Sequence, residues 1–555
     1  MPDVTANRRS CTLASAPGLS GDFVIASAQP GYLGFGAAHD GKSFSVAAVN
    51  GTSWELRTGC TYTHATTTLS RGRLEESSSG SAVNLGSTTV VSVVLPAVHA
   101  AAISRGAPQR NAINIGLLGD SITHNGYYTN GTAPDGVAVP TYYLPGATNN
   151  YGRAWGWGTW VGPLSMQRIQ VVKSWARQTN GVLAPGISPV GWPLSAQITQ
   201  MLADPLFAKV DRVAIMIGTN DQFSTLAAWS AELLTQIARI GRPVDLLTPP
   251  PRSDGAAMTT GGDSLRGWAW LQQCRLVIKR IAEASGGWVR YIDAYSRINS
   301  PLANPDGFGA NMYLPDTTHP SNVGAYLMAD AYVAATLPDS LYGDLDVWPS
   351  NSSAYFGGAA ALDQAFNNPG FATTTGGSGT GDIAADLTVT NVGGASHVGS
   401  SIANPVGPGN MQRLVITSTA AGDGVDVLTS SVHDAGGTFL AAGDEAFGQA
   451  LVTIQGGGIY PRNLFFRLNY FDGTTGWLSL LFEVPSTPLA PGDEKALPLT
   501  GTRSFLLRTP RFIVPATAAT NLTVKFRPTF AGAGSCTIDI GNLEVRRLRA
   551  GAVYT

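Results

Sequence analysis

The stretch NIGLLGDSIT, residues 114–123, decides the fold of the middle of this 555-residue chain. Its first six residues are an apolar run typical of a buried strand, and Asp120 and Ser121 follow at once on a turn. Loops that follow the carboxyl ends of parallel strands are where active sites form. If the run is one strand of a parallel sheet, Ser121 therefore lies where a nucleophile can meet its substrate.

Further apolar runs of this kind alternate with helical patterns through residues 106–340. The expected strands are NIGLLG (114–119), IQVVKSW (169–175), RVAIMIG (212–218), PVDLLT (243–248) and WVRYID (288–293). Between them, stretches such as PLSAQITQMLAD (193–204) carry apolar residues three and four apart, the spacing of a helix face. Strand and helix in alternation predict a parallel sheet covered by helices on both faces.

A serine hydroxyl becomes a nucleophile only when a base accepts its proton, and that base is usually a histidine held by a carboxylate. The segment DTTHP (316–320) supplies both groups. Asp316 and His319 lie three residues apart on a turn ahead of a helical pattern, close enough for the carboxylate to orient the imidazole. We therefore expect Ser121, His319 and Asp316 to form a catalytic triad.

A third motif, GTND (218–221), ends another predicted strand. Its Asn220 can direct an amide N–H at the oxyanion of an ester carbonyl, a contribution typically worth about 3 kcal/mol of barrier. The backbone N–H groups of Ser121 and Gly191 are expected to complete this oxyanion hole. Gly181 and Gly186 are alternatives to Gly191, because all three glycines lie in the loop between a strand and the next helix.

Two other residues could be proposed as the nucleophile or the base, but the sequence favours different roles for both. A literal GDSL occurs at 262–265, but Ser264 follows a polar loop instead of a strand, and it is expected to cap the helix that comes next. His124 lies one helical turn after Ser121, which points its ring beside the serine and not across from it. We expect His124 to be a pocket or surface residue.

The three motifs and the loop glycine resemble, in their order, the four sequence blocks of the GDSL/SGNH hydrolases, with GDSI in place of GDSL. The resemblance covers about 230 residues. It implies a flavodoxin-like α/β/α fold and ester hydrolysis through an acyl-enzyme, with neither metal nor cofactor.

The segment 124–168 interrupts the alternation and is rich in aromatic residues. Trp155, Trp157 and Trp160 could form flat faces on which sugars stack, with Trp192 as a further candidate. The alternative is that AWGWGTWVGPL (154–164) is simply a buried helix.

Residues 1–105 are short alternating segments separated by Gly, Asn and Asp, which predicts a small all-β module. The succession DGKSFSVAAVNGTSWELRTGCTYT (40–63), TTLSRGRLEESSSGSAVNLG (67–86) and TTVVSVVLPA (88–97) resembles the β module near the N-terminus of many bacteriophage tail-fibre and tailspike proteins. That resemblance implies attachment to phage tail components, and localisation in the virion.

Residues 341–555 lose the helical signal and consist of strand-like runs, which predicts a β-sandwich of jelly-roll type. It resembles carbohydrate-binding modules through closing segments such as TIDIGNLEVRRL (537–548). The whole chain is thus expected to have three domains.

The composition of the chain limits the classes of partner that we expect it to bind. The 35 Lys and Arg balance 37 Asp and Glu, which argues against nucleic acid. No run of about 18 apolar residues and no apolar secretory segment occurs, so we expect neither membrane insertion nor a signal peptide. The four cysteines show no metal-ligand spacing and are expected to be buried thiols, with a Cys11–Cys60 bridge as the alternative.

Together these patterns predict a serine esterase that removes O-acetyl groups from a bacterial surface polysaccharide, acting outside the cell as part of a phage tail fibre or spike. Tail fibres of this kind usually form homotrimers, although no heptad repeat is present. Three alternatives are a catalytically silent glycan-binding adhesin, an esterase of lipids or small esters, and a structural virion protein without a ligand.

Overall fold

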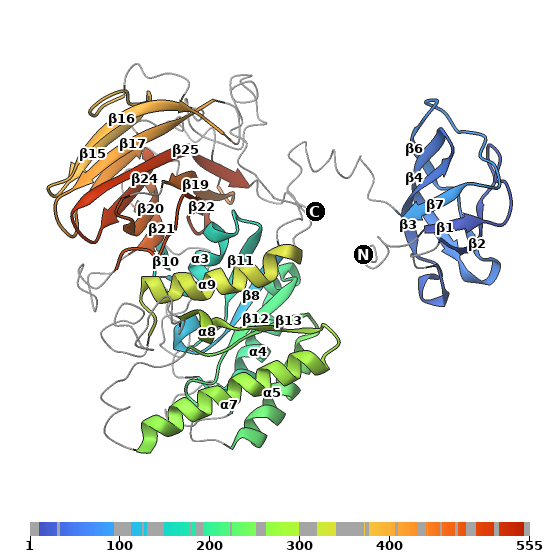
Figure 1. Ribbon diagram of the computed structural model, residues 1–555, viewed down its shortest axis with the longest axis horizontal. Coiled ribbons are helices and arrows are strands. Elements are labelled where there is room, and N and C mark those ends of the chain that lie inside the picture. The colour runs from blue at the N-terminus through green and yellow to red at the C-terminus, as the bar shows by residue number, and fades with distance from the viewer. Residues whose placement is uncertain are drawn as a thin grey trace. The chain divides into compact units, whose positions relative to one another are not determined.

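The computed structural model divides the chain into two compact units, Met1–Arg110 and Asn111–Ala552 (Figure 1). The residues that the structure describes are 10–29, 34–93, 113–124, 127–129, 149–177, 180–183, 193–221, 225–250, 262–298, 319–339, 371, 377–405, 409–429, 440, 442–455, 458–471, 476–483, 495–515 and 521–548. Among them, no helix is both long enough and apolar enough to cross a membrane.

The first unit is an antiparallel barrel, the N-terminal barrel, which closes because β3 pairs with both β7 and β4. Its strands are β1 (Ser10–Leu13), β2 (Phe23–Ala28), β3 (Ser43–Asn50), β4 (Ser53–Thr63), β5 (Thr68–Leu69), β6 (Arg73–Ser77) and β7 (Val90–Val93). Phe23, Phe44 and Tyr62 fill the interior. Cys11 and Cys60 are both buried free thiols, so they form no bridge.

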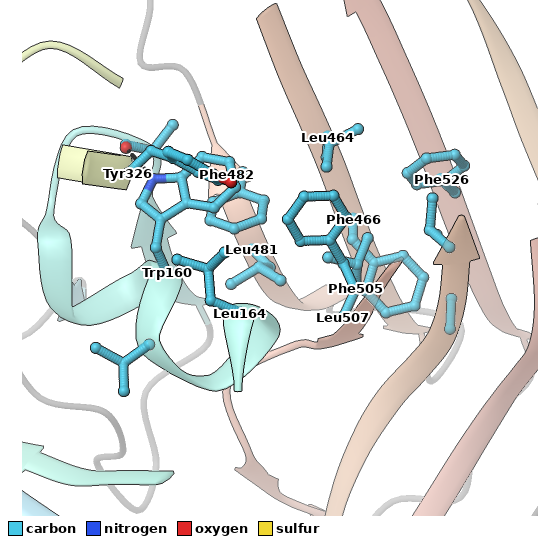
Figure 2. Close-up of a cluster of buried hydrophobic side chains, with 14 of the residues drawn as sticks. Trp160, Leu164, Tyr326, Leu464, Phe466, Leu481, Phe482, Phe505, Leu507 and Phe526 are labelled. Carbon is cyan, nitrogen blue, oxygen red and sulfur yellow. Dashed lines mark hydrogen bonds between the residues drawn. The ribbon is translucent and has the colours of Figure 1, made fainter. Parts of the chain in front are cut away.

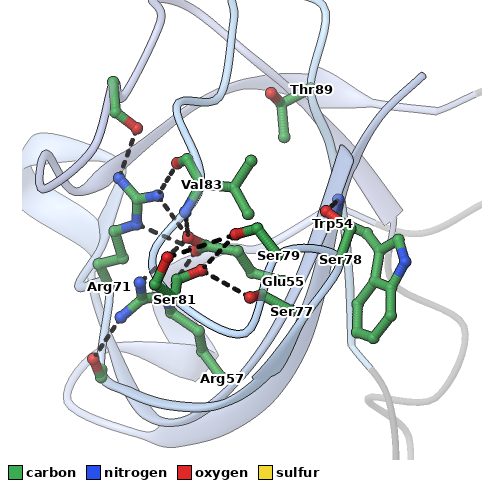
Figure 3. Close-up of polar contacts among 12 residues, drawn as sticks. Trp54, Glu55, Arg57, Arg71, Ser77, Ser78, Ser79, Ser81, Val83 and Thr89 are labelled. Atoms are coloured by element: carbon green, nitrogen blue, oxygen red, sulfur yellow. Dashed lines mark hydrogen bonds and ion pairs between the residues drawn. The ribbon is translucent and has the colours of Figure 1, made fainter. Parts of the chain in front are cut away.

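A buried carboxylate organises one side of this barrel (Figure 3). Glu55 on β4 is fully buried and accepts hydrogen bonds from Arg57 Nε at 2.6 Å, Arg71 Nη2 at 2.8 Å and the Val83 N–H at 2.6 Å. Burial alone would raise the pKa of Glu55, but these hydrogen bonds outweigh it and lower the pKa to about 2. The charged Glu55 thus fixes the loop that contains Val83 against β4.

The second unit begins with a five-stranded parallel sheet of order β11-β8-β12-β13-β14. Its strands are β8 (Ile113–Gly119), β11 (Ile169–Ser174), β12 (Arg212–Met216), β13 (Val244–Leu247) and β14 (Val289–Ile292). Four of them lie within strands predicted from sequence, and β8 begins one residue before the predicted strand at 114–119. We call residues 113–339 the central α/β part.

Helices cover both faces of this sheet, as the alternating pattern predicts (Figure 1). They are α2 (Ser121–His124), α3 (Trp157–Leu164), α4 (Leu194–Ala203), α5 (Leu226–Ile240), α7 (Gly262–Ala284), α8 (Ala294–Ile298) and α9 (Asn322–Thr336). α4, α5 and α7 share one hydrophobic core with the sheet, whereas α3, α8 and α9 share another on the opposite face.

Residues 377–548 form two facing antiparallel sheets, the C-terminal sandwich. One sheet has the order β15-β18-β24-β20-β21-β10-β9 and the other β16-β17-β25-β19-β22, with β23 beside β19. The strands from this region are β15 (Leu387–Val392), β16 (Ser396–Ala403), β17 (Asn410–Ser418), β18 (Gly424–Thr429), β19 (Glu445–Ile454), β20 (Pro461–Phe471), β21 (Gly476–Glu483), β22 (Arg503–Arg508), β23 (Phe512–Ile513), β24 (Asn521–Phe530) and β25 (Gly534–Leu548).

Two strands of the first sheet come from the central α/β part and not from the sandwich region. β9 (Tyr127–Thr129) and β10 (Asn149–Arg153) form an antiparallel pair, and β10 adds in parallel to β21. The aromatic insertion therefore extends the sandwich. It also joins the two parts of the unit through continuous backbone hydrogen bonding.

One tryptophan of the same insertion, Trp160, packs at this junction (Figure 2). Trp160 on α3 is fully buried and stacks on Phe482 of β21, with ring centroids 4.0 Å apart. Trp157 is fully buried, and Trp155 is 4% exposed. A buried ring has no face to offer a sugar, which overturns the prediction of a stacking platform at these three residues. The alternative, a buried helix, is what the structure contains. Trp192 lies outside the described residues.

Candidate active site

The backbone at the end of β8 places Ser121 at the first position of α2. Gly119 adopts φ +152°, and a Cβ there would lie 2.3 Å from the Met216 carbonyl oxygen, so only glycine fits. The fully buried Gln197 of α4 clamps this glycine: the Gly119 N–H donates to Oε1 at 3.0 Å, and Nε2 donates to the Gly119 carbonyl at 3.1 Å. This clamp holds the turn on which the serine sits.

His319 meets Ser121 across the site. Its Nε2 lies 2.8 Å from Ser121 Oγ, although the two residues are 198 positions apart in sequence. His319 lies three residues before the start of α9, and the Ser321 hydroxyl caps that helix by accepting the Gly324 N–H. Asp316, the expected third member of the triad, lies outside the described residues.

Asn220 lies in the turn after β12, beside the loop that follows β11. Its Nδ2 donates to the Asn180 carbonyl oxygen at 2.9 Å. A primary amide carries two N–H donors, so one remains for the oxyanion that this residue is expected to stabilise. Gly218, which begins the GTND turn, has φ +130°, and its carbonyl accepts a hydrogen bond from Trp270 Nε1 at 2.8 Å.

Asp221 holds the loop that contains Gly181 against the GTND turn, a role that was not predicted from the sequence. Its carboxylate accepts the N–H groups of Val182 at 2.9 Å and Leu183 at 3.4 Å, together with Trp229 Nε1 at 3.2 Å. A Cβ at Gly181 would lie 2.3 Å from Asp221 Oδ1, so the close approach requires glycine at that position. Gly186 and Gly191 lie outside the described residues. The signal in the sequence is the Asp that ends GTND.

Asp120, the residue before Ser121, adds a second buried carboxyl group beside that of Asp221 in this part of the chain. It is fully buried, and its Oδ1 accepts the Ile122 N–H at 3.1 Å. Burial raises the pKa of Asp120 to about 7, and the negative charge of Asp221 adds to that increase, whereas the Ile122 hydrogen bond and the charge of His319 oppose it. Burial also raises the pKa of Asp221.

Ser264 and His124, the two alternatives raised by the sequence, lie in helices. Ser264 belongs to the first turn of α7, which begins at Gly262, so the literal GDSL is part of a helix. His124 is buried at the end of α2. Among the residues that the structure describes, no cluster of three or more His, Cys, Asp or Glu side chains is arranged to hold a metal.

No protein-family model matches the sequence, and no curated protein matches it. Solved structures with similarity to the chain include a lipase/acylhydrolase from Enterococcus faecalis, with 20% identity, 41% of this chain and 96% of that chain covered, and a TM-score of 0.27. The aryl esterase of M. smegmatis shows 19% identity over 41% of this chain and 100% of its own, with a TM-score of 0.28. A carbohydrate acetylesterase from Sinorhizobium meliloti shows 15% identity over 40% and 99%, with a TM-score of 0.27. At this similarity the neighbours assign no residue roles to this chain.

Proposed function

We propose that the chain is a serine esterase that removes acetyl groups from a bacterial surface polysaccharide. The observation that carries the proposal is the 2.8 Å approach of His319 Nε2 to Ser121 Oγ at the carboxyl edge of a parallel sheet. A base within hydrogen-bond reach of a serine hydroxyl is the geometry that nucleophilic catalysis needs.

In the proposed reaction, Ser121 Oγ attacks the ester carbonyl while His319 Nε2 takes the hydroxyl proton. The second N–H of Asn220 and backbone N–H groups stabilise the oxyanion. His319 then gives the proton to the leaving sugar hydroxyl, which leaves an acetyl-serine. Water attacks this ester with His319 as base, and acetate leaves. Asp316 would orient His319 throughout.

The polysaccharide and the phage setting are proposals from the organisation of the chain. The N-terminal barrel would attach the protein to the phage tail, as a homotrimer, and the C-terminal sandwich would contact glycan at the host surface. The sandwich and the central α/β part share a hydrophobic core, which supports a common task for both.

Hydrolysis of a chromogenic acetate ester tests the nucleophile directly. We expect Ser121→Ala to reduce kcat at least about a thousandfold, and Ser264→Ala, in the literal GDSL, to serve as the matched control with activity retained. An inactive wild type, or an active Ser121→Ala variant, would defeat the proposal in favour of a glycan-binding adhesin.

A further inference from the structure

One face of β20 carries side chains that the sandwich core does not use. Leu464, Phe466, Leu468 and Tyr470 are buried in the core, and Figure 2 shows the first two among the core side chains. Side chains alternate along a strand, so the intervening residues face the opposite way. These are Phe465, Arg467, Asn469 and Phe471, which are partly buried except for Phe471, at 36% exposure.

Arg467 lies in a cluster that holds three cations and one carboxylate. It pairs across the sheet with Lys525 of β24, and Arg527 lies two residues further along the same face. Lys525 Nζ and Arg527 Nη2 both bind Asp426 Oδ2, at 2.7 and 2.6 Å. The Asp426 carboxylate is thus shared by Lys525 and Arg527, and it is also the carboxylate whose attraction acts on Arg467.

The guanidinium of Arg467 is left without an equivalent partner. Its Nε–H is buried from solvent and has no hydrogen-bond acceptor among the described residues. Burial lowers the pKa of Arg467; the attraction of Asp426 opposes this change, and the repulsion of Arg527 adds to it. A partly buried cation in this state costs stability, which an anionic ligand would recover.

We propose that this face of β20 binds an acidic oligosaccharide, with Arg467 pairing a sugar carboxylate. A guanidinium presents a planar pair of donors that matches a carboxylate. The rings of Phe465 and Phe471 would lie against apolar sugar faces about 20 Å apart, since a strand rises about 3.4 Å per residue. The Asn469 amide would bind sugar hydroxyls between them.

This inference rests on the proposed function in one respect, because it names the substrate class of the esterase. The sheet connects the two sites: β20 is followed by β21, β10 and β9, and three strand spacings amount to about 14 Å. β9 begins at Tyr127, three residues after α2 ends at His124. The proposed binding face and Ser121 are thus linked through neighbouring strands of one sheet.

Binding of polygalacturonate to the full-length Ser121→Ala variant, measured by calorimetry at low salt with dextran as the neutral control, tests the site without turnover. We expect Arg467→Met to weaken polygalacturonate binding about tenfold or more and to raise the unfolding midpoint. Arg413→Met is the matched control, because Arg413 pairs with Asp539 on the other sheet and is expected to leave this binding unchanged.

Equal binding by Arg467→Met, or a lowered unfolding midpoint, would overturn the inference, because the first denies contact with the ligand and the second indicates a structural ion pair. Arg467-dependent binding of a phosphate-bearing teichoic acid in place of polygalacturonate would overturn the carboxylate assignment. These outcomes are separate from the proposed esterase activity, which the chromogenic acetate ester reports independently.

Discussion

At the scale of single residues, the backbone around Ser121 matters as much as the His319 ring that contacts its hydroxyl. Gly119 accepts a conformation and a close approach that no other residue tolerates, and Gln197 fixes it from a helix 78 residues away in sequence. Asp221 does the same for the glycine loop through backbone N–H groups. The candidate site is therefore held by buried polar contacts to the backbone.

Asp120 makes the stability of the second unit depend on pH. Its folded-state pKa, about 7, lies above the ordinary value of 3.8, so the folded protein prefers the protonated carboxyl. The associated stability is complete below about pH 4 and is lost as the pH rises through 7. We expect Asp120→Asn, which cannot ionise, to gain unfolding temperature relative to wild type as the pH is raised from 4 to 8.

Differential scanning calorimetry of the full chain at several pH values measures this difference. The wild type at pH 4 provides the internal reference, because its Asp120 is protonated there. A difference between variant and wild type that stays constant over the range would contradict the raised pKa.

At the scale of elements, a substitution in α3 can test whether the aromatic insertion stabilises the fold. Trp160 stacks on Phe482, and its Nε1 donates to the Ala154 carbonyl at 2.6 Å. We expect Trp160→Ala to cost about 3–5 kcal/mol of unfolding free energy, because it opens a cavity between α3 and β21. Urea unfolding measures the loss.

Trp288→Ala is the matched control, since that ring is 46% exposed and its removal is expected to cost well under half as much. If Trp160→Ala instead left stability unchanged and raised only KM for a glycan substrate, the platform interpretation would regain support.

Sequence patterns predicted the elements whose signal is local. The five strands follow from apolar runs, and the Ser121–His319 pair follows from two short motifs, one at a strand end and one on a turn ahead of a helix. The role of the aromatic insertion could not be predicted from the sequence, because an aromatic run at helical spacing is compatible with a buried helix and with a binding face alike. Its partners, β21 and Phe482, lie more than 300 residues further along the chain. The hydrogen bonds of Asp221 to the N–H groups of Val182 and Leu183 were missed for the same reason, since loop-to-loop contacts leave no periodic pattern.

At the scale of the molecule, the boundary near residue 340 does not separate independent bodies. Asn322 at the start of α9 donates through Nδ2 to the carbonyls of Arg462 and Lys495, both at 2.7 Å. One hydrophobic core also runs from α3 and α9 into the sandwich. We expect a chain truncated after residue 340 to aggregate, because this apolar face would be left exposed.

A chain of residues 111–555, which keeps the whole second unit, is expected to stay soluble and to hydrolyse the chromogenic acetate ester at the rate of the full chain. Solubility after expression and the calorimetric transition compare the two truncations. A folded, active 1–340 fragment would show that the sandwich is dispensable.

The parallel pairing of β10 with β21 also sets an order of events during synthesis. The ribosome must add 323 residues after Arg153 (476 − 153) before Gly476, the first residue of β21, exists. At about 5–20 residues per second, that interval is roughly 15–65 s. During that interval, β9 and β10 lack the strand β21 with which β10 pairs. On the proposed function, the nascent chain would carry Ser121 long before it carries a finished active site, and ester hydrolysis would wait until β21 has emerged.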